Sequence, residues 1–129
     1  MALAKDVESQ GAMGVVLNAP ISDLNLIAVA RAVDIPVIVT VTKRETNITA
    51  RINAGASILN VAGGKRTPEI VQSIREIAPN IPIIATGGPT NEAIRATIAA
   101  GANAVTYTPP SARVMFSEIM DNYREESID

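Results

Sequence analysis

The sequence contains an internal repeat, which restricts the fold more than any other feature of the chain. Residues 35–64 align without gaps on residues 81–110, at an offset of 46, and ten of the thirty aligned residues are identical. The identical residues of the first copy are Ile35, Pro36, Ile38, Thr40, Ile48, Ala50, Ile52, Ala54, Gly55 and Ala56. Periods of roughly 20–50 residues indicate a fold that stacks one supersecondary unit repeatedly.

A weaker copy of the unit occupies the start of the chain. A Gly-Ala pair followed by a short apolar run begins at Gly11, and the same pattern begins at Gly55 and Gly101. Each of these glycines is expected just past a helix end, in the left-handed conformation that glycine adopts without steric cost.

The length of 129 residues and the hydrophobic content of 47% suit a single core. We therefore predict one domain of βα repeats over residues 1–129. Its repeat units are residues 35–80 and 81–126, preceded by a partial unit at residues 1–34.

Each repeat unit contains two strand-helix modules. Short runs rich in Val and Ile alternate with segments that carry apolar residues every three or four positions, the pattern of strands followed by amphipathic helices. Because the runs mostly do not alternate apolar with polar residues, we predict parallel strands that are covered on both faces. The expected strands are residues 14–18, 37–41, 57–61, 83–85 and 104–107.

Two α/β architectures fit five such modules, because strand-helix alternation with short loops enforces parallel strands and right-handed crossovers. One is a partial TIM (β/α) barrel with sequential strand order, since a complete barrel usually needs about 250 residues. The alternative is a flavodoxin-like, doubly wound open sheet with the order 2-1-3-4-5.

The segment IPIIATGGPTNEAIRATIAAGANAV at residues 81–105 resembles the seventh and eighth strands of the phosphate-binding TIM-barrel superfamily. This resemblance implies that the five modules are the fourth to eighth units of a barrel and that the first three strands are missing. These families usually carry a Gly and a small residue after the last strand, where this chain has Thr106-Tyr-Thr-Pro-Pro-Ser111. The TPPS segment before an amphipathic helix is also similar to uncharacterised bacterial proteins described as hydrolases.

A phosphate site is expected where the loops gather at the carboxyl ends of the strands, the ligand end of either architecture. Two of these loops contain Gly-Gly, which lets the backbone approach an anion near a helix N-terminus. The alternative is that both pairs are only tight turns. The predicted phosphate-binding residues are Gly63, Gly64, Lys65, Thr86, Gly87 and Gly88.

Three further residues at strand ends are catalytic candidates. Lys43 follows an expected strand directly, and desolvation or the neighbouring Arg44 could lower its pKa for Schiff-base chemistry. The alternative for Lys43 is a solvated surface residue. Asn18 and Asn60 end two other strands and complete the set.

The composition excludes several kinds of chemistry. The chain has no Cys and no His, so thiolate nucleophiles, zinc-thiolate sites and an imidazole base are absent. No acidic pair is expected at the strand ends, because Asp23, Glu45, Glu69 and Glu92 all fall in expected first turns of helices. We predict no metal site. The sequence also lacks the G-x-G-x-x-G fingerprint of dinucleotide-binding proteins, so we predict no cofactor.

The sequence also limits the partners. Only three aromatic rings and a net charge of −2 argue against nucleic-acid binding, and no apolar stretch is long enough to span a membrane. We therefore expect a cytoplasmic protein.

The predicted function is a phosphate-binding barrel-type domain that acts on or binds a small phosphorylated metabolite. Whether the domain is an enzyme stays open at this point. One alternative is a non-catalytic binding or regulatory module. The other is a barrel fragment whose open strand edges are covered by a second copy or by the missing N-terminal barrel portion.

Overall fold

The structure is a computed structural model and describes residues 2–18, 20–86, 90–106 and 112–128. Five parallel strands form one sheet in the sequential order β1-β2-β3-β4-β5. The flavodoxin-like alternative requires the order 2-1-3-4-5 and is therefore wrong, whereas an arc of a TIM-type barrel is confirmed. The strands are β1 (Val15–Leu17), β2 (Val37–Val41), β3 (Ile58–Val61), β4 (Ile83–Thr86) and β5 (Ala104–Thr106).

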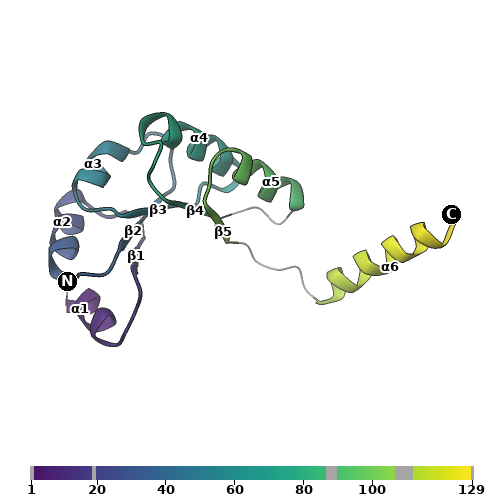
Figure 1. The fold of residues 1–129 in the computed structure, drawn as a ribbon, viewed down its shortest axis with the longest axis horizontal. Coiled ribbons are helices and arrows are strands. Elements are labelled where there is room, and N and C mark those ends of the chain that lie inside the picture. The colour runs from purple at the N-terminus through teal and green to yellow at the C-terminus, as the bar shows by residue number, and fades with distance from the viewer. Residues whose placement is uncertain (1, 19, 87–89, 107–111, 129) are drawn as a thin grey trace.

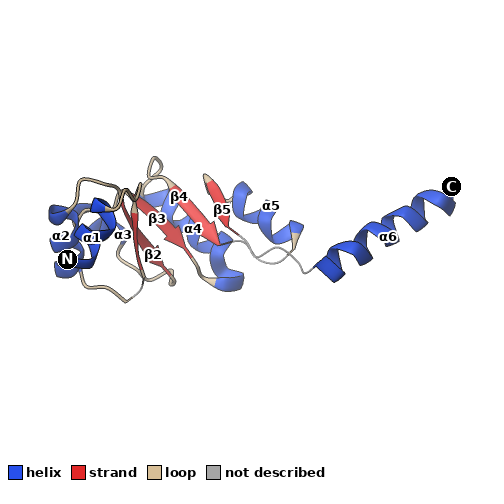
Figure 2. Cartoon of the chain, turned by 90° about the horizontal axis from the view of Figure 1, so that it is seen from below, coloured by secondary structure: helices blue, strands red, loops and turns tan. Residues whose placement is uncertain are grey.

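Helices follow the strands along the chain. Figure 1 shows the curved sheet with α2 to α5 along its outer side, while α6 projects away from the sheet in both Figure 1 and Figure 2. A short 3-10 turn, η1 (Gly64–Arg66), leads into α4. The helices are α1 (Ala2–Ser9), α2 (Asp23–Ala32), α3 (Ile48–Asn53), α4 (Thr67–Ile77), α5 (Asn91–Ala99) and α6 (Ala112–Ile128).

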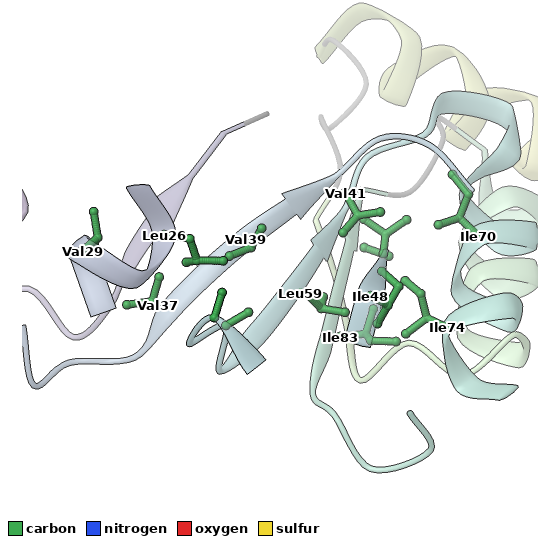
Figure 3. Packing of buried hydrophobic residues seen from close by; sticks show 14 of the residues in the cluster. Leu26, Val29, Val37, Val39, Val41, Ile48, Leu59, Ile70, Ile74 and Ile83 are labelled. Atoms are coloured by element: carbon green, nitrogen blue, oxygen red, sulfur yellow. The ribbon is translucent and has the colours of Figure 1, made fainter. Parts of the chain in front are cut away.

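The hydrophobic core lies between the outer face of the sheet and these helices (Figure 3). Because successive strand residues point to opposite faces, every second residue of β2 faces the helices, and Val37, Val39 and Val41 are buried there. Leu26 of α2 and Ile74 of α4 are fully buried against this layer. Fully burying each such side chain contributes about 1.5–3 kcal/mol relative to leaving it in water.

The inner face of the sheet is largely uncovered, so the prediction that both faces are covered is wrong for this face. Val16 of β1 is 51% exposed, Ile38 and Ile84 are half-buried, and Ala104 and Thr106 are exposed. In a complete barrel this face is filled by side chains from the opposite strands. An arc of five strands has no opposite strands to fill it.

Candidate functional site at the carboxyl edge of the sheet

The loop between β3 and α4 carries half of the predicted phosphate-binding residues. A Cβ on Gly63 would lie 2.4 Å from Cδ1 of Ile70, so this position lets α4 pack closely. The Gly63 amide donates to Thr67 Oγ1 at 3.0 Å and is therefore engaged within the loop. Gly64 has a φ of 62° with open space around it, and Lys65 is exposed. Gly64 and Lys65 are thus the better placed of the three to meet a ligand.

A cleft of about 840 Å³ lies between α4 and α5 beside this loop. Three of the predicted phosphate-binding residues, Gly64, Lys65 and Thr86, line it together. Small and apolar residues make up much of the remaining wall. The other lining residues are Ala62, Pro68, Thr90, Glu92, Ala93, Ala96 and Thr97.

Some polar side chains of this α4–α5 cleft are engaged in hydrogen bonds within the protein, and the others can contact a ligand. Thr90 Oγ1 accepts from the Ala93 amide at 3.1 Å and caps α5, and Thr97 Oγ1 donates to the Ala93 carbonyl at 2.8 Å. Within the part of the chain that the structure describes, Lys65 and Glu92 form no ion pair. The ammonium of Lys65 is therefore the cleft's available positive group.

A second polar group lies on the inner face, where the structure brings Asn18 and Asn60 to the same residue of β2. Thr40 Oγ1 donates to Asn18 Oδ1 and accepts from Asn60 Nδ2, both at 3.4 Å. At the repeat offset of 46, Thr40 and Asn60 correspond to Thr86 and Thr106, whose hydroxyls also lie 3.4 Å apart. These neutral groups can orient a polar ligand, but they cannot carry a proton as an acid or base near neutral pH.

Lys43 is the third catalytic candidate. It is exposed in the loop after β2, and its carbonyl accepts from the Thr46 amide at 3.3 Å and from the Thr46 hydroxyl at 2.9 Å. Its side chain does not line the α4–α5 cleft. The neighbouring Glu45 lies in the turn before α3, so its expected place in the first turn of a helix is wrong.

Some predicted features fall outside the described residues. These include Gly87 and Gly88, together with most of the segment 106–111 that follows β5. Within the described ranges, no cluster of three or more acidic residues could hold a metal ion. No described helix is both long and apolar enough to cross a membrane.

Sequence reasoning missed Thr40, Thr90, Glu92 and Thr97. The repeat itself could have indicated Thr40, since it aligns with the predicted Thr86. Thr97 could not be found in this way, because its repeat partner is Arg51, a residue of different size and charge.

Comparisons with known proteins support the fold. No protein-family model matches the sequence, and no curated protein matches it. Inosine 5′-monophosphate dehydrogenase from Legionella pneumophila is similar in structure, with a TM-score of 0.66 and 21% identity over 81% of this chain and 34% of that chain. Phosphonopyruvate hydrolase in complex with oxalate and Mg²⁺ has a TM-score of 0.66 and 18% identity over 84% of this chain and 55% of that chain.

Both similar proteins are TIM-barrel enzymes, and this chain spans 34% and 55% of their lengths. The five sequential strands therefore correspond to part of a barrel. At these identities the likeness shows the fold alone.

Proposed function

We propose that this chain is a phosphate-binding, barrel-type domain that binds a small phosphorylated metabolite in the α4–α5 cleft. The observation that carries the proposal is that Gly64 and Lys65, between β3 and α4, and Thr86, at the carboxyl end of β4, line one cleft. Such loops at the carboxyl ends of parallel strands are the usual place for ligands in this architecture.

The chemistry of the cleft favours an anion. The Lys65 ammonium offers three hydrogen-bond donors, and no described carboxylate lies within ion-pair distance of it. Gly64 leaves its backbone open to a close approach, since no atom lies within 4 Å of where its Cβ would be. We propose that Thr86 and the following Gly87 and Gly88 complete the phosphate site.

The names of the two similar enzymes agree with this proposal. One is named for inosine 5′-monophosphate and the other for phosphonopyruvate. Both compounds carry a phosphorus oxyanion. The shared fold makes an equivalent ligand class reasonable for this chain.

We propose binding and assign no reaction. Lys65 and Glu92 are the ionisable residues among those that line the cleft, and neither is paired with a second acid or base in the described structure. The Asn18–Thr40–Asn60 group is a second place where a polar substrate group could be oriented. Lys43, which is exposed and does not line the cleft, stays a prediction.

The proposal is tested by calorimetric titration of the chain with methyl phosphate. Lys65→Ala is expected to weaken binding at least about tenfold, because a hydrogen bond to a charged group contributes about 1.5–3 kcal/mol. Arg66→Ala is the matched control, since Arg66 is the exposed neighbour and does not line the cleft. Equal affinity in the wild type and Lys65→Ala would contradict the proposal.

A further inference from the structure

The internal repeat produces two clefts in corresponding places, and they differ in size. The α2–α3 cleft has a volume of about 350 Å³, against about 840 Å³ for the α4–α5 cleft. Its lining residues on the α3 side are Thr46, Asn47 and Arg51. At the offset of 46 these correspond to Glu92, Ala93 and Thr97, and all three line the larger cleft.

An ion pair occupies the smaller cleft. Arg51 Nη1 lies 3.1 Å from Oδ1 of Asp23 in the first turn of α2, and only 18% of the Arg51 side chain is exposed. The Asn47 side chain also contributes, because its Oδ1 accepts from the Ala50 amide and caps α3. In this copy an ion pair therefore spans the space between the two helices, and the Asn47 side chain is engaged within α3.

The equivalent positions in the larger cleft, Glu69 and Thr97, do not form such an ion pair. Thr97 takes the place of Arg51, is 1% exposed, and turns its hydroxyl back to the carbonyl of Ala93 in its own helix. The acid in the first turn of α4, Glu69, pairs with Arg44 at 3.1 Å instead of reaching toward α5. No side chain of the described residues forms an ion pair across this cleft.

Its wall is instead built from small, apolar groups. Ala62, Pro68, Ala93 and Ala96 line the space, while Lys65 provides a charged group and Thr86 lies at the carboxyl end of β4. Open apolar surface next to a few placed polar groups is the usual make-up of a small-molecule site. A bare anion or a fully polar ligand would leave this apolar wall in contact with water.

Building on the proposed function, we infer that the α4–α5 cleft takes an apolar or aromatic part of the ligand beside its phosphate. The ligand class is therefore a phosphate monoester with an apolar body. The loss of the Asp23–Arg51 type of ion pair in the second repeat is what makes room for that body.

Two phosphate monoesters of the same charge test the inference, methyl phosphate and phenyl phosphate. We expect phenyl phosphate to bind the wild type at least tenfold more tightly, because the phenyl ring removes much more apolar wall from water than a methyl group does. Affinities are measured by calorimetric titration.

A matched pair of variants locates the effect. Ala96 is exposed and lines the cleft, so Ala96→Leu should fill part of it and reduce the phenyl advantage to less than threefold. Ala99→Leu lies on the same helix outside the cleft and should behave like the wild type. Both changes place a good helix former at an exposed helical position, and circular dichroism verifies the fold.

The outcomes separate the two proposals. Equal affinity of the wild type for both esters would overturn the inference. A phenyl advantage that persists in Ala96→Leu would also overturn it. In either case, binding of methyl phosphate by the wild type would still support the proposed function. If Ala99→Leu removes the advantage as strongly as Ala96→Leu, the inference is also overturned. If the wild type binds neither ester, both proposals are contradicted.

Discussion

Gly55 lies where the end of α3 meets α2. Its φ is 120°, and a Cβ at this position would lie 2.4 Å from the Cβ of Ala30. The Gly-Ala pattern predicted left-handed glycines, and φ values of 94° at Gly11 and 117° at Gly101 confirm it. The close approach of Ala30 could not be predicted, because it depends on how two helices pack rather than on a local pattern.

Gly55 and Gly11 both have a positive φ, but only at Gly55 would a new methyl group meet another residue. Gly55→Ala should lower the free energy of unfolding by about 2–4 kcal/mol, because backbone strain and overpacking act together. Gly11→Ala should cost only about 1–2 kcal/mol, since its new methyl group meets no atom within 4 Å. Urea unfolding measures both. Equal losses would show that contact with Ala30 is unimportant.

In the candidate site too, some features follow from the local sequence and others only from tertiary packing. Asn18 and Asn60 were predicted at strand ends, and parallel pairing brings both to Thr40. Lys65 and Thr86 were predicted from their loops, and the packing of α4 beside α5 places both on one cleft. The role of Thr97 required the tertiary structure, because a buried threonine inside a helix has no sequence signature of a cleft.

At the scale of elements, Arg75 of α4 joins the amino-terminal ends of β4 and β5. Its Nε donates to the Gly101 carbonyl at 2.9 Å, its Nη1 to the Ile81 carbonyl at 2.6 Å, and its Nη2 to Asn103 Oδ1 at 2.7 Å. Asn103 Oδ1 also accepts from the Ile83 amide at 2.9 Å. This end of barrel strands, opposite the ligand end, usually serves stability.

Arg75→Ala should therefore destabilise the chain without weakening phosphate binding. We expect a loss of about 2–4 kcal/mol in the free energy of unfolding, because charge-assisted hydrogen bonds to several carbonyls are removed at once. Arg95→Ala, at an exposed position of α5, is the control and should change stability by less than about 0.5 kcal/mol. A similar result for both variants, measured in urea, would refute the role of Arg75.

The elements themselves were largely predictable from the sequence. Pro36 and Pro82 directly precede expected strands, and β2 and β4 begin at the next residue. The expected ends are less accurate, and β1 is one residue shorter at each end than its apolar run. Strand ends depend on pairing partners, and β1 is paired only with β2 within the described sheet.

At the scale of the whole molecule, the uncovered parts of the sheet lie at its inner face and its two edges. Exposed large apolar residues occur near both ends of the arc, with Leu3 and Met13 before β1 and Phe116, Ile119 and Tyr123 on α6 after β5. Unpaired strand edges readily accept another strand. Coverage by a second copy or by a further barrel portion stays a prediction, and a monodisperse monomer in light scattering would count against it.

The strand order decided the architecture, and the sequence alone could not supply it. The repeat predicted equivalent βα modules but allowed either a barrel arc or an open sheet, because both place helices after parallel strands. Their order depends on which strands pair, a long-range property. The observed pairing of β1 with β2 alone, rather than with β2 and β3, resolves the choice.

The central claim is that the α4–α5 cleft of a barrel arc is a ligand site. Its most direct test is a titration of the ¹⁵N-labelled chain with phenyl phosphate. Amide shifts report on every strand and loop at once. We predict the largest changes at Gly64, Lys65 and Thr86. Changes confined to the inner face around Thr40, with none at Lys65, would contradict the account.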